Sequence, residues 1–325
     1  MDANLDLAGW RRCLRCPECR AGALLTPSGV DQVKCPVCAS RFPIVAGRLV
    51  LLRRDNELFK DSDYTQAAVE ARSPERAGSL LGRFLPSPSI NLSQLRVLKQ
   101  LVQLLDARGP SDVLIIGGGR QRSWLDPILL ANVAHRVCYV DIDVGANVEV
   151  FCDAHELPFA DAAFDGVITT AVLEHVMYPE QAAAEMARVL RPGGLIYSEL
   201  PFMQQVHEGA YDFTRYTLSG HRRLLSAFSE LDAGMVAGPG TALVWAIENF
   251  ALALFPRALR SVTKAGARVI FGWLKYADVL LKNRPRAMDG ASCTYFFGRR
   301  YDGTGRTTDS QIIAGYRGGI RLTHT

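Results

Sequence analysis

The sequence contains no uninterrupted apolar run of about 18 residues, the length that crossing a bilayer requires. The first residues, MDANLDLAGWRRC, lack the apolar core of a secretory signal. A large excess of one charge is also absent, because 37 lysines and arginines face 33 aspartates and glutamates, a formal net charge of +4. Such a mild charge gives no reason to expect a nucleic-acid partner. We therefore expect a cytoplasmic protein, in which paired cysteines bind metal more often than they form disulfides.

Four of the eight cysteines form two Cys-Pro-x-Cys pairs, Cys16 with Cys19 and Cys35 with Cys38. Each such turn directs two thiolates at one ion. Together the turns predict a tetrahedral four-thiolate zinc site with no position open for catalysis. Cys13 is a competing ligand, but Cys16 is preferred because it gives both pairs the same pattern. A redox pair, or a ribbon that has lost its metal, stays an alternative.

The stretch after the second pair, RFPIVAGRLVLL at 41–52, is the next recognisable feature. It resembles the strand that follows the second CxxC in small zinc-ribbon domains of the tRNA-methyltransferase-activator type. The resemblance covers about residues 13–53 and places a zinc ribbon at 1–54. Ribbons of this type also occur fused to the front of methyltransferases. Residues 55–90 are charged, polar and dotted with proline, which predicts a linker with room for one helix.

The middle of the chain opens with an apolar stretch that runs into three glycines, DVLIIGGGR at 112–120. An amphipathic helix pattern at 91–107 precedes it. Further strand and helix patterns follow: RVCYVDID, VEVFCDAHELPF, FDGVITTAVLEHV, the helix PEQAAAEMARVL, a turn at 191–194 and the strand LIYSELPF. This alternation predicts an α/β fold with a parallel sheet. The glycines alone suit a nicotinamide, a nucleotide or S-adenosylmethionine, although no P-loop lysine follows them.

The order of these phrases is more specific than any one of them. VLIIGGG, YVDID, CDAHELPFADAAFD, VITTAVLEHV and ARVLRPGGLIYSELPF together resemble the class I S-adenosylmethionine-dependent methyltransferases, in particular the type 11 group. The resemblance spans about residues 95–235 and implies a Rossmann-like core, which we place at 91–240. It also implies S-adenosylmethionine as the cofactor.

The same resemblance implies the residues that bind the cofactor. They are Gly117, Gly118 and Gly119 for the methionine portion, Asp141 and Ile142 for the ribose, Asp153 and Ala154 for the adenine, and Thr170 and Ala171 near the sulfonium. Two departures stand out. Ile115 occupies the place of an acid that normally helps to anchor the methionine amino group. The short path from Asp143 to Val148 leaves little room for the usual helix after the second strand.

Four side chains are candidate bases, and the first three are favoured for catalysis. Glu174 and His175 follow the fourth strand pattern, His207 follows the fifth, and Glu208 comes directly after His207. A hydroxyl acceptor needs a group that accepts its proton, and an imidazole suits that task near neutral pH. The alternative is that these residues orient their loops and touch no substrate. We expect no catalytic metal here, because relatives with one carry a carboxylate three residues before the Glu-His pair, where this chain has Ala171.

The loop after the fifth strand pattern, about 200–217, concentrates aromatic, acidic and basic residues. It resembles a "PF…H…YD-x-x-R-x-T" phrase of type 11 enzymes from bacterial glycan and natural-product pathways. The substrate-binding residues that this implies are Tyr211, Asp212, Arg215 and Tyr216. The alternative is that Asp212 and Arg215 form a structural pair that fixes the loop. Thr217 is expected to cap the helix that follows.

The last third combines apolar helices with most of the chain's basic excess. Residues 241–288 hold eight lysines and arginines against two acids. We expect a helical lid or insertion at 241–290, the last strand of the core at 291–302 and a flexible tail at 303–325. The helices are interpreted as a lid, as a homodimer face, or as a peripheral contact with the inner face of the membrane.

The sequence as a whole predicts an S-adenosylmethionine-dependent methyltransferase that acts on a small-molecule or glycan acceptor. O-methylation in a bacterial polysaccharide or natural-product pathway is the favoured reaction. One alternative is an rRNA or tRNA base methyltransferase whose ribbon docks RNA, against which the mild charge counts. The other is a catalytically silent scaffold, which Ile115 supports.

Overall fold

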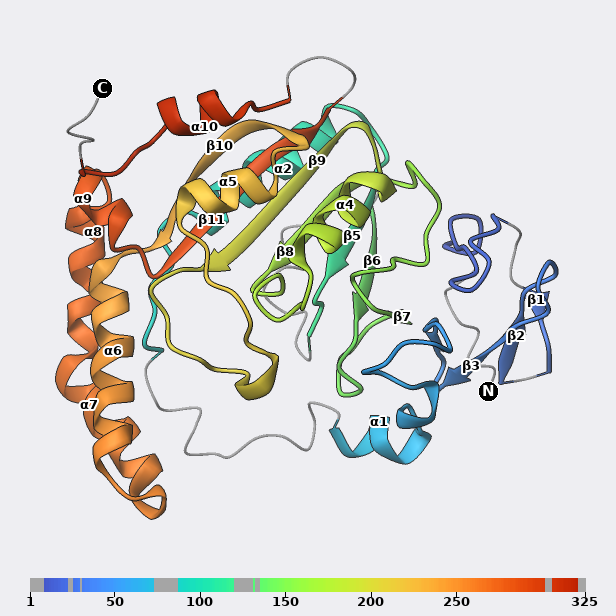
Figure 1. Cartoon of the computed structure of the whole chain (residues 1–325), viewed down its shortest axis with the longest axis horizontal. Helices are drawn as coiled ribbons and strands as arrows, with labels where there is room; N and C mark the ends of the chain where they lie inside the picture. Colours follow the sequence, from blue (N-terminus) through green and yellow to red (C-terminus); the bar gives the residue numbers. More distant parts are fainter. Residues whose placement is uncertain are drawn as a thin grey trace. The chain divides into compact units, whose positions relative to one another are not determined.

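The computed structural model describes residues 9–22, 26–29, 31–72, 87–119, 131, 135–301 and 306–320 (Figure 1). The chain falls into two compact units. The first comprises Met1–Gly78, Leu101–Thr169 and Tyr178–Ile196. The second comprises Ser79–Gln100, Thr170–Met177 and Tyr197–Thr325.

The sheet of the first unit begins with the ribbon. Strands β1 (Thr26–Pro27), β2 (Gln32–Lys34), β3 (Arg41–Val45) and β4 (Arg48–Val50) pair antiparallel in sequence order. β4 then pairs in parallel with β7 (Val150–Phe151), so that Leu49 lies opposite Val150 and Val50 opposite Phe151. The ribbon therefore contributes a strand to the α/β sheet.

The centre of this sheet is parallel. β5 (Asp112–Ile116) lies between β6 (Arg136–Asp141) and β8 (Phe164–Thr170), and the order continues as β4-β7-β6-β5-β8-β9. Residues 113–116 are buried throughout, which is why β5 is continuously apolar rather than alternating. The predicted strand at 112–116 and the α/β fold class are confirmed. Parallel order also brings the ends of β5 and β6 to one edge, where ligands of such sheets bind.

Helices α1 (Gln66–Arg72), α2 (Gln94–Asp106) and α4 (Pro179–Val189) accompany these strands. The apolar side chains of α2 at Leu98, Leu101 and Leu105 are wholly buried, as the helical spacing predicted, whereas Leu95 is exposed. No helix lies between β6 and β7, a stretch that is described completely. The short connection from Asp143 to Val148 therefore leaves out the helix that usually follows the second strand, as predicted.

The second unit is built on antiparallel strands. β9 (Leu190–Pro201) runs from the first unit into the second, where the order is β9-β11-β10. β10 (Phe228–Ala237) pairs antiparallel with β11 (Cys293–Arg300), the expected last strand. β9 begins at Leu190 and includes the predicted turn at 191–194, with Gly193 at φ 74°. β10 was not expected from the sequence.

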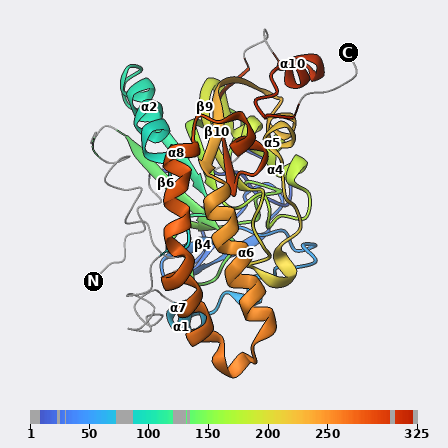
Figure 2. The same cartoon turned by 90° about the vertical axis from the view of Figure 1, so that its left-hand side faces the viewer.

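In the sequence, α5 (Leu218–Leu224) lies between β9 and β10, and the longer set of helices lies between β10 and β11. α5 starts at Thr217, whose Oγ1 accepts from Gly220 N at 3.1 Å, the expected cap. The insertion before the last strand consists of α6 (Pro239–Leu254), η6 (Arg257–Leu259), α7 (Arg260–Phe271), η7 (Gly272–Tyr276), α8 (Ala277–Leu281) and α9 (Pro285–Asp289). α6 and α7 run side by side as a hairpin (Figure 2). Within the described ranges, no helix has the length and apolar character needed to cross a membrane.

The described end of the chain differs from the flexible tail predicted at 303–325. Residues 309–314 form α10 (Asp309–Ala314), capped by Thr308. The guanidinium of Arg222 donates to the carbonyl oxygens of Ile312 at 3.1 Å and Gly315 at 3.0 Å. These contacts hold α10 in place, so the glycine content of this segment did not indicate disorder.

Candidate functional site

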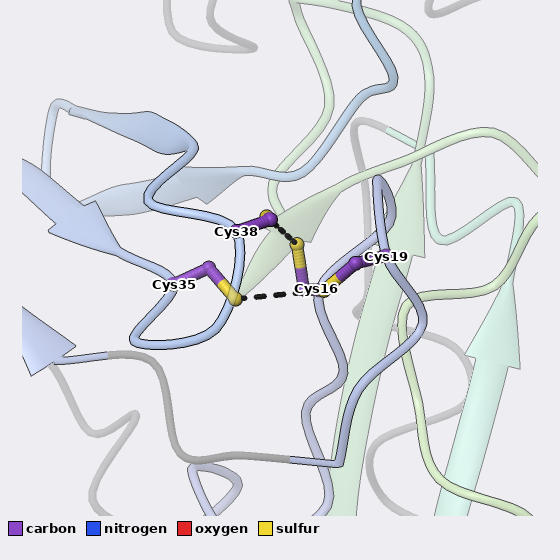
Figure 3. A group of neighbouring side chains, drawn as sticks. All are labelled: Cys16, Cys19, Cys35 and Cys38. Carbon is purple, nitrogen blue, oxygen red and sulfur yellow. Dashed lines mark hydrogen bonds between the residues drawn. The ribbon is translucent and has the colours of Figure 1, made fainter.

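The four predicted zinc ligands converge in the first unit (Figure 3). Cys16 Sγ lies 3.6 Å from Cys38 Sγ, and Cys19 Sγ lies 3.7 Å from Cys35 Sγ. Sulfurs at about 2.3 Å from a tetrahedral zinc are about 3.8 Å apart, so the spacing suits that ion. Cys13 is not among the convergent residues, which supports the choice of Cys16.

The two halves of the cysteine cluster are built alike. Arg20 N donates to Cys16 O at 2.8 Å, and Ala39 N donates to Cys35 O at 3.0 Å. Arg20 and Ala39 both have positive φ, 55° and 62°, which turns each loop back after its second cysteine. Burial raises the pKa of Cys16. A cation among the four sulfurs would offset that cost of burying thiolate charge.

The glycine loop follows β5 at the carboxyl edge of the parallel strands. Gly117 and Gly119 have positive φ, 75° and 61°, a conformation that side chains disfavour. A side chain at Gly118 would be crowded, since its Cβ would meet the Tyr139 ring at 3.0 Å. Gly119 N donates to Asp141 Oδ2 at 2.8 Å. The loop and the acid that the sequence singled out therefore form one structure.

Asp141 is held by backbone groups on both of its oxygens. Oδ1 accepts from Ile142 N at 2.7 Å and Asp143 N at 2.9 Å, while Oδ2 accepts from Gly119 N. Burial raises the pKa of Asp141, although these hydrogen bonds oppose the effect. A carboxylate offers about four acceptor sites, so Oδ2 can still accept a bond from a ligand hydroxyl. Loop and acid thus fit the methionine and ribose portions of S-adenosylmethionine.

Asp153, expected at the adenine, has partners that the sequence did not reveal. Its Oδ2 accepts from Asn56 Nδ2 at 2.9 Å, and its Oδ1 accepts from His155 N at 2.9 Å and lies 2.6 Å from His155 Nδ1. Burial opposes ionisation, but the His155 bonds outweigh it and lower the pKa of Asp153. His155 Nε2 accepts from Tyr178 N at 3.1 Å. The Asp-x-His spacing was the one signal of this network.

The remaining expected cofactor residues lie near these or at the end of β8. Ala154 follows Asp153 directly, and Thr170 is the last residue of β8. Ala171 has a positive φ of 54°, and its N donates to Glu199 O at 3.1 Å. That backbone strain marks a sharp turn before Glu174.

Glu174, His175 and His207 come together in the second unit, and we call them the Glu-His-His cluster. His175 Nε2 lies 3.1 Å from His207 Nε2. Glu174 Oε1 lies 3.6 Å from His175 Nε2 and 3.9 Å from His207 Nε2. The Glu174 side chain is wholly buried, and neither of its carboxylate oxygens has a hydrogen-bond partner among the described residues. Burial raises the pKa of Glu174 to about 8 and lowers the pKa of His175.

A short loop supports this cluster. Asp212 accepts from His207 N at 2.9 Å and from Arg215 Nη2 at 2.7 Å. Burial alone would raise the pKa of Asp212, but the Arg215 bonds lower it to about 2. Phe213 N donates to Glu174 O at 2.8 Å. The structural pair considered as an alternative for Asp212 and Arg215 is therefore present.

The other two residues expected at the substrate differ from each other. Tyr211 is exposed, and its carbonyl oxygen lies 2.8 Å from His175 Nδ1. Tyr216 is 9% exposed and lies against Gly220, so its ring is part of the interior. Trp245, which sequence reasoning missed, has its ring centroid 6.5 Å from that of His207. Only its place in an apolar helix pattern was visible in the sequence.

Comparison with known proteins is consistent with this geometry. A family model described as "Methyltransferase domain" matches residues 116–198. The ubiquinone/menaquinone biosynthesis C-methyltransferase UbiE of Neisseria gonorrhoeae is 42% identical over 67 residues, 20% of this chain and 27% of that protein. UbiE of Neisseria meningitidis is 40% identical over 127 residues, 37% of this chain and 52% of that protein. The chain thus spans about half or less of the length of these relatives.

Solved structures give weaker likenesses. The O-methyltransferase of a Brevibacillus brevis polyketide synthase is 14% identical, with a TM-score of 0.43 over 71% of this chain and 86% of that one. The 1,6-didemethyltoxoflavin-N1-methyltransferase of Burkholderia thailandensis is 18% identical, with a TM-score of 0.38 over 84% of this chain and 100% of that one. The matched family segment begins at the end of β5 and ends within β9, so it contains the glycine loop and Asp141.

Proposed function

We propose that the protein is an S-adenosylmethionine-dependent methyltransferase. The observation that carries the proposal is the hydrogen bond from Gly119 N to Asp141 Oδ2 at 2.8 Å, inside the segment that matches a methyltransferase domain. It ties a glycine loop to the strand-end acid at the edge where α/β sheets bind ligands. The cofactor supplies an electrophilic methyl group on a sulfonium. The protein supplies binding, orientation and exclusion of water.

We assign the acceptor chemistry to the second unit. His175, His207 and Glu174 are proposed to handle the proton of a hydroxyl acceptor, and both imidazoles are partly accessible. Exposed Tyr211 and partly exposed Arg215 lie beside them and suit a small polyhydroxyl molecule or a glycan. The buried side chain of Asp212 acts instead by fixing Arg215 and the backbone of His207. O-methylation in a polysaccharide or natural-product pathway remains our proposal. The buried Tyr216 has no part in it.

The cysteine cluster is proposed to hold one structural zinc. All four sulfurs would be ligands, which leaves no coordination position for substrate. Its effect would be on the stability of the ribbon and of the strand pair β4–β7.

Calorimetry with S-adenosylmethionine and S-adenosylhomocysteine tests the first proposal. One site per chain is expected for each, and absence of binding to both would overturn it. Transfer of a labelled methyl group to a panel of sugars, sugar nucleotides, phenols and ribosomal RNA tests the acceptor class. Labelled sugars are the expected product. Labelled RNA would replace the hydroxyl proposal by base methylation, and binding without any transfer would favour a silent scaffold.

A further inference from the structure

The hydrogen bonds of the Glu-His-His cluster fix where its protons can lie. His175 Nδ1 lies 2.8 Å from the carbonyl oxygen of Tyr211. His207 Nδ1 lies 3.3 Å from Gln205 O and 3.5 Å from Asp212 Oδ2. A carbonyl and an ionised carboxylate only accept hydrogen bonds, so each Nδ1 carries the ring hydrogen. In the neutral rings, both Nε2 atoms are therefore lone-pair donors.

These lone pairs point at one another. The two Nε2 atoms are 3.1 Å apart, and Glu174 Oε1 lies 3.6 and 3.9 Å from them. Ionised Glu174 would be a third electron donor, wholly buried and without a hydrogen-bond partner among the described residues. Three donors this close repel each other unless a cation lies between them, and a buried unpaired carboxylate is costly.

We propose that Glu174, His175 and His207 bind one divalent first-row transition-metal ion. Two imidazoles and one carboxylate form a common ligand set for such ions, and they leave positions open. Ligands at about 2.0–2.2 Å from a tetrahedral ion lie about 3.3–3.6 Å apart, close to the observed separations. In known metal sites, ligating histidines donate their other N–H to a carbonyl or carboxylate, as both do here.

This site differs from the expectation that no catalytic metal binds here. That expectation rested on Ala171, which has no carboxylate to offer. The structure brings in the third donor from His207 instead, across a loop held by Asp212 and Arg215. A site completed by so distant a residue leaves no local spacing in the sequence.

An open metal position would serve the methyl transfer, and this role rests on the proposed function. A cation next to a hydroxyl oxygen lowers the pKa of that hydroxyl. With the ion bound, the three side chains promote loss of the proton through the ion and do not accept it themselves. The proton passes to solvent, and the oxygen forms a bond to the methyl carbon. The carbon–sulfur bond breaks with its electron pair left on sulfur, which gives neutral S-adenosylhomocysteine.

The test is a Co²⁺ titration of the full chain after its cysteine cluster has been loaded with zinc, without cofactor or acceptor. Wild-type protein should bind one Co²⁺ with visible absorption but without the strong near-ultraviolet band of thiolate ligands. Glu174→Gln and His207→Ala should each weaken Co²⁺ binding at least about 100-fold, since loss of even an outer partner costs 10–100-fold. Glu208→Gln, an exposed acid next to His207, is the matched control and should bind within about threefold of wild type.

Thermal unfolding and S-adenosylmethionine affinity, measured on every variant, show that the variants fold. No Co²⁺ uptake by the wild type would overturn the proposal and would indicate that a proton joins the two imidazoles. Equal uptake by Glu174→Gln would also overturn it. Cofactor binding without Co²⁺ uptake would overturn the metal site and leave the proposed function intact. Co²⁺ uptake without cofactor binding would support the metal site and overturn the proposed function.

A second inference comes from the turn between α6 and α7, residues 250–262, which we call the hairpin tip (Figures 1 and 2). Its exposed large apolar side chains are Phe250, Leu254, Phe255, Leu259 and Val262. Arg257 and Arg260 are exposed among them. The stretch between Glu248 and Asp278 contains no acidic residue, and both of those acids are buried. Arg268 pairs with Glu248 at 2.6 Å.

We infer that the hairpin tip docks on an anionic phospholipid surface. Exposed apolar side chains interleaved with arginines, with no acid among residues 249–277, match a surface that is negative outside and apolar beneath. The alternative occupant, a second copy of the chain, would bring arginines against arginines if the same tip met itself.

Sedimentation with vesicles tests this inference. Full-length protein should bind vesicles of phosphatidylcholine mixed with phosphatidylglycerol, less so at high salt, and should not bind pure phosphatidylcholine. Phe255→Ser combined with Leu259→Ser should reduce binding at least about tenfold, because the strength of binding at a membrane surface scales with the apolar area that is buried there. Val37→Ser, an exposed valine of the ribbon, is the control. Equal binding by the double variant, or none by wild type, overturns the inference, as does a dimer that the double variant abolishes.

Discussion

The two groups of convergent side chains differ in how the chain builds them. The cysteine cluster of the first unit draws its ligands from residues 16–38, through two turns of the same design. The Glu-His-His cluster of the second unit joins neighbours, Glu174 and His175, to His207 on another loop. The first offers the four ligands of the proposed tetrahedral zinc site, and the second offers three donors to the proposed catalytic ion. A site built from regular local spacing can thus be recognised in the sequence, whereas one built by a long-range meeting needs the folded chain.

The largest effect that would test this comparison is expected from the removal of a cysteine ligand. Cys35→Ser should abolish stoichiometric zinc and destabilise the ribbon by several kcal/mol, because zinc binding and folding of such domains are coupled. Elemental analysis and thermal unfolding measure the two effects. Cys13→Ser, outside the cluster, should keep both zinc and stability. A Cys35→Ser protein that unfolds like wild type would show that the ribbon does not need its metal.

The second unit should respond in the opposite way. His207→Ala should lower turnover about 100-fold or more while thermal stability and cofactor affinity stay close to wild type. The reason is that His207 is partly exposed and supports little of the core. Steady-state kinetics with the identified acceptor measures the loss. If both His175→Ala and His207→Ala keep full turnover, the cluster has no part in the reaction.

Asp141 sharpens the comparison within the first unit, because it separates cofactor binding from zinc binding. Asp141→Ala should weaken S-adenosylmethionine binding by about 1–3 kcal/mol, the cost of leaving ligand hydroxyls without a charged partner. Calorimetry measures the dissociation constant, and zinc content should not change. Asp143→Ala is the matched control. An unchanged affinity for Asp141→Ala would move the ribose contact to another acid, with Asp143 the first to test.

The smallest expected effect concerns a third histidine of the second unit. His221 is wholly buried, with Nε2 3.0 Å from Ser198 Oγ, and burial lowers its pKa to about 3. In the unfolded chain His221 binds a proton as the pH falls through about 6.5, whereas in the folded chain it stays neutral until the pH reaches about 3. Stability should therefore fall by about 1 kcal/mol between pH 7 and pH 5.5 on account of this residue. Denaturant unfolding of wild type and His221→Gln at both pH values measures it, and an equal pH dependence in both would contradict the assignment.

Much of the first unit could be predicted from the sequence for physical reasons. β5 is buried on both faces, so its continuous apolar run predicts a parallel strand in the core. The three glycines after it predict a tight turn at a ligand site. The cysteine pairs need only local turns. These features depend on neighbours in the sequence, which a single chain displays directly.

What was missed depends on partners far along the chain. β10 reads FSELDAGMVA, with polar residues and a glycine, and becomes a strand because it pairs with β11 at Cys293–Arg300. α10 is held by Arg222 from a distant helix. The bonds from Asn56 and His155 to Asp153, and the meeting of His207 with Glu174, likewise require the folded chain.

The parallel pairing of β4 with β7 has a consequence for how the protein would fail. Leu49 N donates to Glu149 O at 3.2 Å, and Leu51 N donates to Phe151 O at 2.9 Å. If the ribbon lost zinc and detached, these carbonyl groups and the outer side of β7 would become an unprotected sheet edge. Such edges recruit strands from other molecules. Zinc scarcity would then remove the protein through self-association, without any change to the residues that handle the methyl group.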